Sequence, residues 1–202
     1  ALYTHDAGVL KVTAQLYPLM PGEPREARLE VRRAGRWVEA ARARVAYPGW
    51  TAHFRVEHWD GSATTPYRVR HGEAAIFEGT IRRDPADRGE VVVANLGCNS
   101  SRTRGPRPEI VKRLAAQDPD LLFFSGDQTY HHTEHTAGWI EFGLQFREVM
   151  RDRPTICIPD DHDVGHPNLW GEEGGDSTDS GGADAGYFFP AAYVNMVQRA
   201  QA

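Results

Sequence analysis

The sequence predicts an α/β protein, α+β overall, in which an antiparallel β-sandwich precedes the first half of an α/β sandwich domain. Residues 8–83 alternate apolar and polar side chains, which is typical of half-buried strands. Residues 91–158 instead alternate apolar runs with segments of helical spacing, as in a βαβαβ unit. Between them, residues 82–90 are polar and contain a proline and a glycine. We therefore expect two domains, 1–86 and 87–202.

The first domain contains short alternating segments separated by turn signals such as Pro-Gly and Asp-Gly. Examples of the expected strands are 9–14, 27–31, 51–56, 67–70 and 75–81. Their regular spacing favours an antiparallel sandwich of the immunoglobulin or fibronectin III kind. Trp37, Trp50 and Trp59 fall in this domain. We expect them to pack in its core or on its surface, because one aromatic ring buries a large area; a sugar-binding face is the alternative.

The second domain begins with a continuous apolar run at residues 91–96, which predicts a strand buried on both faces. Further strands are expected at 120–125 and 154–158, and helices at 108–117, 136–150 and 190–202. Pro108 suits the first turn of its helix. The glycine-rich and acidic residues 171–186 are expected to form a mobile loop.

The composition is that of an ordinary soluble protein of 202 residues, with 40% apolar residues, a net charge of −5 and a mean hydropathy of −0.55. No stretch of about 18 apolar residues exists, so we expect no membrane span. Residues 1–6 lack the basic and apolar regions of a signal peptide, so any secretion signal has been removed or never existed. A pI near 6.0 argues against a nucleic acid as a specific partner.

The negative charge is concentrated in the second half of the chain. Residues 1–90 carry a net +2 and residues 91–202 a net −7. Such an excess is most often a solvated surface, and cation binding is the alternative. The two cysteines, Cys98 and Cys157, are too few for a disulfide scaffold. One bridge, buried thiols or metal ligands all remain open for the pair, and Cys157 is expected in the core.

Polar groups follow each of the three expected parallel strands. Right-handed crossovers place the carboxyl ends of such strands at one edge, where ligands bind. Cys98, Asp127, Tyr130, Asp161 and His162 should therefore converge there. Clustered carboxylates repel each other unless a cation lies among them. This mixture of carboxylate, imidazole, thiolate and phenolate suits iron, manganese or zinc, and a pair of metals would suit phosphoryl transfer.

These strand ends resemble the alkaline phosphatase D (PhoD-like) branch of the calcineurin-like metallophosphoesterases. The matching motifs are Gly-Asp-Gln-Thr-Tyr at 126–130 and Asp-Asp-His-Asp at 160–163, with Cys98 after the first strand. The wider superfamily has Asp-x-His at the first strand end and Gly-Asn-His-Asp/Glu at the third. The departures at 97–99 and 160–163 are those that the PhoD-like branch shows. The branch also carries an N-terminal β-sandwich.

The resemblance implies a dinuclear centre of Fe³⁺ with Ca²⁺, with manganese or zinc as alternatives. It implies that Asp127 bridges the two metals, that Cys98 and Tyr130 bind the first, and that Asp161 binds the second. His162 would touch the substrate phosphate or protonate the leaving group. The implied reaction is hydrolysis of phosphomonoesters or phosphodiesters by a metal-activated hydroxide.

Three further expectations follow from the resemblance. Asn99 and Arg102, just after the first strand end, would contact the substrate phosphate. The remaining metal ligands of the superfamily come later in the chain, so a further C-terminal segment of the same domain is expected to complete the site. A periplasmic or extracellular location is also implied.

Two other functions remain open. The aromatic sandwich and the incomplete metal site would suit a non-catalytic binding or adhesion module. Residues 131–135, His-His-Thr-Glu-His, match the H-x-x-E-H pattern of some zinc proteases, which requires a helix through the motif. Because these residues follow a strand end, we expect a polar cluster there rather than a protease site.

Overall fold

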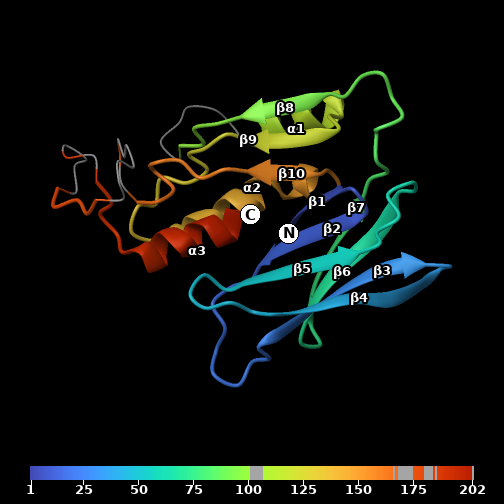
Figure 1. The fold of residues 1–202 in the computed structure, drawn as a ribbon, viewed down its shortest axis with the longest axis horizontal. Coiled ribbons are helices and arrows are strands. Elements are labelled where there is room, and N and C mark those ends of the chain that lie inside the picture. The colour runs from blue at the N-terminus through green and yellow to red at the C-terminus, as the bar shows by residue number, and fades with distance from the viewer. Residues whose placement is uncertain (101–106, 166, 168–174, 180–183, 185, 202) are drawn as a thin grey trace.

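The computed structural model describes residues 1–202 except 101–106, 166, 168–174, 180–183, 185 and 202. Its N-terminal part is a sandwich of two antiparallel sheets (Figure 1). The first sheet has the order β1 (Leu2–Asp6), β2 (Val9–Gln15), β5 (Thr51–Glu57). The second has the order β4 (Arg36–Arg44), β3 (Glu26–Arg33), β6 (Thr65–His71), β7 (Ala75–Ile81). The predicted antiparallel sandwich is confirmed.

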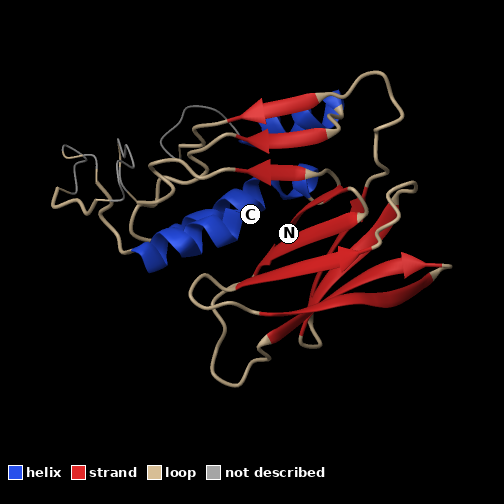
Figure 2. Cartoon of the chain, in the orientation of Figure 1, coloured by secondary structure: helices blue, strands red, loops and turns tan. Residues whose placement is uncertain are grey.

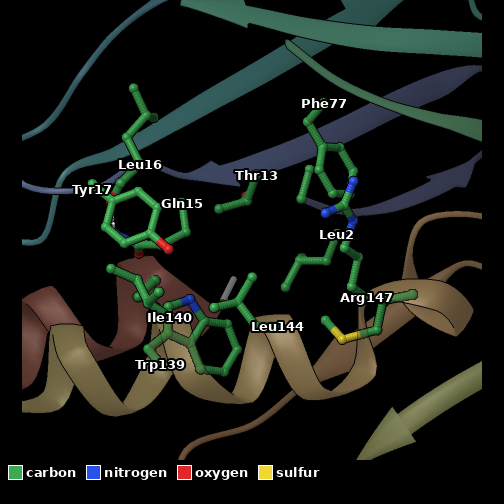
Figure 3. A pocket seen from close by; sticks show the side chains of 14 residues that line it. Leu2, Thr13, Gln15, Leu16, Tyr17, Phe77, Trp139, Ile140, Leu144 and Arg147 are labelled. Carbon is green, nitrogen blue, oxygen red and sulfur yellow. Dashed lines mark hydrogen bonds between the residues drawn. The ribbon is translucent and has the colours of Figure 1, made fainter. Parts of the chain in front are cut away.

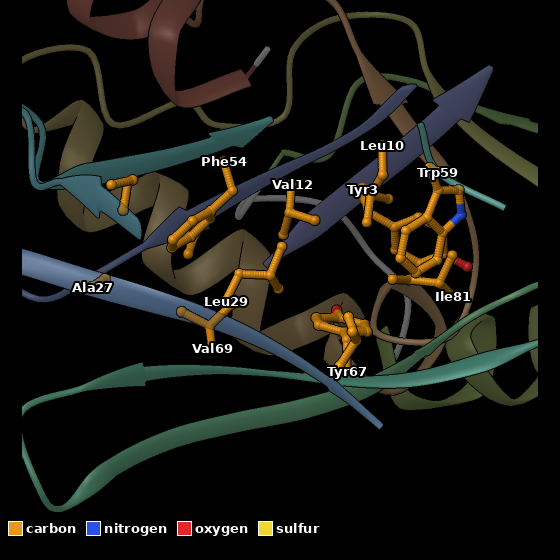
Figure 4. Packing of buried hydrophobic residues seen from close by; sticks show 14 residues of the cluster. Tyr3, Leu10, Val12, Ala27, Leu29, Phe54, Trp59, Tyr67, Val69 and Ile81 are labelled. Atoms are coloured by element: carbon orange, nitrogen blue, oxygen red, sulfur yellow. The ribbon is translucent and has the colours of Figure 1, made fainter. Parts of the chain in front are cut away.

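Alternating side chains from both sheets fill the space between them (Figure 4). Leu10 and Val12 of β2 and Leu29 of β3 are fully buried, as the two-residue period requires. Trp59 lies in this core, whereas Trp50 packs under the Arg25 guanidinium, 5.3 Å from its ring centre. The expectation that the tryptophans serve packing is therefore confirmed for these two residues.

Two strands of the sandwich are not among the segments named from the sequence: β1 precedes the alternating region 8–83, and β4 lies within it. β1 reads Leu-Tyr-Thr-His-Asp and β4 reads Arg-Trp-Val-Glu-Ala-Ala-Arg-Ala-Arg, so neither alternates cleanly. Both are held by pairing with a neighbour: β1 pairs with β2, and β4 pairs with β3 across a register shift at Leu29/Glu30. Arg42 of β4 also bonds Glu26 of β3. Pairing with a neighbouring strand thus stabilises both strands although their alternation is weak.

The C-terminal part has a parallel sheet in the order β10 (Thr155–Cys157), β9 (Leu121–Phe124), β8 (Val93–Leu96). The helices are α1 (Arg107–Gln117), α2 (His135–Met150) and α3 (Ala191–Gln201), and Figure 2 shows them beside the three strands. The predicted βαβαβ order and all three predicted helices are confirmed.

The expectation that residues 91–96 are buried on both faces is wrong. Val91, Val92 and Val93 are 49%, 47% and 50% exposed. One face of the sheet packs on side chains of α1 and α2, in a cluster that includes Phe124 and Phe142. Within the described residues, Val93 of β8 and Ile156 of β10 remain exposed. The run is apolar, but β8 is an edge strand with only one neighbour.

Three smaller expectations have mixed outcomes. Cys98 and Cys157 are both free, and Cys157 is buried in the core as expected. The loop expected at 171–186 lies largely outside the described residues. Among the described residues, none of the helices has the length and apolar character needed to cross a membrane.

The two parts of the chain are in direct contact. β1 lies beside β10, and Leu2 of β1 belongs to the cluster under the parallel sheet. Thr80 N–H of β7 donates to the Arg151 carbonyl after α2, at 3.1 Å. A cavity of about 180 Å³ lies between them, and Figure 3 shows Phe77 of the sandwich facing Trp139 and Leu144 of α2.

We expect Gly79→Ala to destabilise the protein by about 1–3 kcal/mol, which is typical of overpacking. A Cβ at position 79 would overlap the Arg151 carbonyl oxygen and lie 2.8 Å from Tyr67 Cε1. Urea unfolding measures the change. Gly89→Ala is the matched control, because no atom lies within 4 Å of its added Cβ. Equal stability of the two variants would contradict this account of the domain contact.

Candidate metal centre

Backbone hydrogen bonds hold the carboxyl ends of the three parallel strands together. After β8, Cys98 N–H donates to the Gly126 carbonyl at 3.1 Å, and Asn99 N–H donates to the Asp127 carbonyl at 2.8 Å. The segments that follow β9 and β10 are tied by a side chain: Asp163 accepts from Thr129 N–H at 3.0 Å. This arrangement agrees with the expectation from the sequence that the carboxyl ends of the three strands meet at one edge of the sheet.

The chain adopts the left-handed region at the strand ends, where it turns sharply. Cys98 has φ 54° and Asp127 has φ 57°, although neither is glycine. Gly126 has φ 120°, and a Cβ there would lie 2.6 Å from Asp160 Cβ. Non-glycine residues in this region carry strain of order 1–3 kcal/mol, which is found most often at functional sites. Here the left-handed backbone conformation places the Cys98 and Asp127 side chains at the same edge of the sheet.

Five predicted site residues lie in one cluster. Candidate ligand atoms of Asp127, Asp161 and His162 all lie within 4.8 Å of one another. The Tyr130 hydroxyl donates to Asp127 Oδ2 at 2.8 Å, and the Cys98 thiol lies 3.6 Å from the same oxygen.

Asp127 carries a buried charge that the protein compensates only in part. The residue is 7% exposed, and within the described residues its Oδ1 accepts no hydrogen bond. Burial raises the pKa of its carboxyl, against the hydrogen bond from Tyr130, which lowers it. Partial burial and donation to Asp127 raise the pKa of the Tyr130 phenol. A cation among these groups would supply the missing charge, and carboxylates, imidazole, thiol and phenol are all metal ligands, so the residues fit a metal.

The two expected phosphate contacts have different outcomes. Arg102 lies outside the described residues. The Asn99 side chain is engaged within the protein: its amide group donates to Gln145 Oε1 at 2.9 Å and to the Gln128 carbonyl at 3.2 Å. Its Oδ1 accepts from Arg107 Nε at 2.5 Å. A cavity of about 200 Å³ adjoins Cys98, Asn99 and Arg107. The role of Asn99 toward substrate stays a prediction.

Sequence reasoning assigned no role to Asp163, which joins two strand ends. Its second carboxylate oxygen accepts from Asp160 N–H at 3.1 Å, in addition to the bond from Thr129. The side chain is 1% exposed, and burial raises its pKa to about 6. Its place at the end of the 160–163 motif was the available signal. The pairing with Thr129 is through space and has no sequence signature.

The H-x-x-E-H pattern does not lie within a helix, because α2 begins at its last residue, His135. A zinc protease of this type needs a helix through the whole motif, and α2 does not provide one. His135 is buried beside Trp139 and so lies apart from a polar cluster. His131 Nε2 lies 3.0 Å from Glu141 Oε2 at the surface. His132 Nε2 lies 2.7 Å from Nδ1 of His162, in the cluster of site residues.

Because of the buried His135, we expect the free energy of unfolding to fall in acid. It is 2% exposed, and burial lowers its pKa from 6.5 to about 4. The pKa of His135 is lower in the folded protein than in the unfolded chain. The contribution of neutral His135 to the free energy of unfolding is therefore complete above pH 6.5 and is lost as the pH falls toward 4. We expect the wild type to lose about 3 kcal/mol more than His135→Phe between pH 7 and 4 in urea unfolding. Parallel pH profiles for the two proteins would contradict this.

Solved structures that share this fold include a PhoD and a purple acid phosphatase. A structure of PhoD superposes with a TM-score of 0.65 at 14% identity, covering 83% of this chain and 39% of PhoD. A purple acid phosphatase from yellow lupin (Lupinus luteus) seeds superposes with a TM-score of 0.57 at 13% identity, covering 96% of this chain and 37% of the phosphatase. No family model and no curated protein matches the sequence. The chain thus spans less than two-fifths of each structure, and over that span it shares their fold.

Proposed function

We propose that this chain carries part of the dinuclear metal centre of a PhoD-like phosphoesterase, which hydrolyses phosphomonoesters, phosphodiesters or both. The observation that carries the proposal is the meeting of Asp127, Asp161 and His162 within 4.8 Å, with a buried Asp127 oxygen that accepts no hydrogen bond within the described residues. The likeness in fold to PhoD and to a purple acid phosphatase supports it.

The chemistry of the side chains divides them between two cations. Cys98 and Tyr130, both on Asp127 Oδ2, would hold Fe³⁺, because thiolate and phenolate suit a transition metal. Asp161 would hold Ca²⁺, since calcium prefers oxygen ligands; manganese and zinc are the alternatives. Asp127 would be the ligand shared by both cations. Such cations lower the pKa of water and neutralise charge on a phosphate.

The remaining work falls to the side chains. Cys98 and Tyr130 would each give up a proton if they bound a cation, so cation binding is expected to release protons. His162 lies beside the carboxylates, where an imidazole N–H can donate to a phosphate oxygen or to the leaving oxygen. Asp163 holds the segments that carry Asp127 and Asp161 in register, because it accepts backbone N–H groups from both.

We propose further features of the whole protein. A further C-terminal segment of the same domain would supply the remaining ligands, because this chain spans less than two-fifths of the structures it resembles. The sandwich would be an accessory domain of the immunoglobulin or fibronectin III kind, and the location would be periplasmic or extracellular.

The test uses the protein at its full natural length, loaded with Fe³⁺ and Ca²⁺ or with Mn²⁺. We expect hydrolysis of a nitrophenyl phosphomonoester or of a bis-nitrophenyl phosphodiester, lost on chelation and restored by the cation. Failure to hydrolyse either ester, by protein shown to hold its cations, would overturn the proposal. Metal-independent binding to glycans, without hydrolysis, would favour an adhesion module.

A further inference from the structure

His132 and His162 form a hydrogen-bonded pair of imidazoles at the candidate metal centre. Nε2 of His132 lies 2.7 Å from Nδ1 of His162, and the ring planes differ by 18°. The His162 ring also packs against Tyr130, with ring centres 4.2 Å apart. Nδ1 of His162 is thus engaged by another side chain, and Nε2 is the nitrogen left for a cation or a phosphate.

The hydrogen bond determines what His162 offers at Nε2. A single proton lies between two neutral rings, because each neutral imidazole carries one N–H. If His132 donates, His162 keeps its proton on Nε2 and presents a donor to a phosphate or leaving oxygen. If His162 donates, its Nε2 presents a lone pair, which is the form that binds a metal. In both cases the ring of His162 is held in one orientation by His132.

His132 is itself fixed from two other segments. Its carbonyl accepts from the Tyr193 hydroxyl of α3 at 2.9 Å. Gly165, after β10, approaches the same carbonyl so closely that a Cβ there would lie 2.6 Å from the oxygen. A side chain held in this way can orient its neighbour, as partners of metal-bound histidines do in general.

We propose that His132 is a positioning residue of this centre: its hydrogen bond to Nδ1 sets the ring orientation and tautomer of His162. The inference rests on the proposed phosphoesterase function for its kinetic consequence, but the imidazole pair is a property of the chain alone. The neighbouring His131 provides a matched comparison, because it bonds Glu141 at the surface instead.

The experiment compares His132→Ala, His132→Gln and His131→Ala. In the cation-loaded protein at full length, we expect His132→Ala to lower kcat about 10–100-fold, the range for loss of a residue that orients a metal ligand. KM should change little. His132→Gln, whose amide can replace the hydrogen bond, should recover much of the loss. His131→Ala should resemble the wild type, and circular dichroism checks that each variant folds.

A second readout does not need activity. In ¹⁵N NMR spectra of the cation-free protein at pH 8, we expect one dominant His162 tautomer in the wild type and in His131→Ala, and averaging of the two tautomers in His132→Ala. An averaged His162 ring in the wild type, or kcat and spectra in His132→Ala equal to those of His131→Ala, would overturn the proposal. An ordered His162 tautomer in a protein that hydrolyses no ester would reject the phosphoesterase function and retain the pair.

Discussion

Replacing Asp127 with asparagine is expected to remove cation binding at the strand ends while leaving the fold intact. Oδ2 of Asp127 contacts both the Cys98 thiol and the Tyr130 hydroxyl. Within the described residues its Oδ1 accepts no hydrogen bond, which leaves this oxygen for a cation. We expect Mn²⁺ affinity to fall by more than about 100-fold, since loss of a residue that merely orients a ligand already costs about 10–100-fold. Turnover should fall by at least about 10³-fold, because the cations supply several kcal/mol of charge stabilisation.

The same variant should keep or gain stability without cations. The asparagine amide has the shape of the carboxylate but carries no charge. Burial raises the pKa of the Asp127 carboxyl, because the charged form is costly there, and the substitution removes that cost. Calorimetric titration with Mn²⁺ and urea unfolding measure the two effects. Glu141→Gln is the control, because Glu141 lies on α2 at the surface and bonds only His131 and Gln145 among the contacts described. Unchanged Mn²⁺ affinity in Asp127→Asn would contradict the assignment of this residue.

The second large effect is expected at Gly138 of α2. A Cβ there would overlap Thr129 Oγ1 and lie 3.0 Å from His131 Cβ. Thr129 is the residue whose N–H bonds Asp163, so a shift of this loop separates two strand ends. Gly138→Ala should therefore cost about 1–3 kcal/mol in stability, as overpacking does, and should also weaken Mn²⁺ binding.

Gly143 provides the matched control in the same helix. No atom lies within 4 Å of a Cβ added there, so Gly143→Ala should gain about 0.5–1 kcal/mol from helix propensity. In thermal unfolding, we expect a lower Tm for Gly138→Ala and a higher Tm for Gly143→Ala than for the wild type. The shift should be roughly 2–4 °C per kcal/mol in a chain of this size. A rise in both variants would mean that α2 does not press against the loop after β9.

The parallel strands and helices could be predicted because their signals are local. An apolar run followed by polar residues indicates β9, and the apolar spacing over 136–150 indicates α2. Strands β1 and β4 could not be predicted in this way, because their pairing partners supply what their own residues lack. The exposure of Val93 was not predicted for a related reason. An apolar run shows that a strand can be buried, but it does not show which neighbouring elements cover the strand.

The candidate site was predictable where topology alone decides. Cys98, Asp127 and Asp161 each follow a parallel strand, so the crossover rule brings them to one edge. The hydrogen bonds of His132 and Asp163 join them to partners about thirty positions away, His162 and Thr129. Contacts of this kind follow from the packing of loops against α2 and α3, which no spacing in the sequence encodes.

The most direct measurement is an anomalous diffraction map of crystals grown with Mn²⁺. The central claim predicts a peak within bonding distance, about 2.0–2.3 Å, of oxygens of Asp127 and Asp161 or of a His162 ring nitrogen. The same map from Asp127→Asn crystals should lack that peak. A wild-type map with no peak at the strand ends under millimolar Mn²⁺, or an equal peak in the variant, would contradict the claim that these side chains form a metal centre.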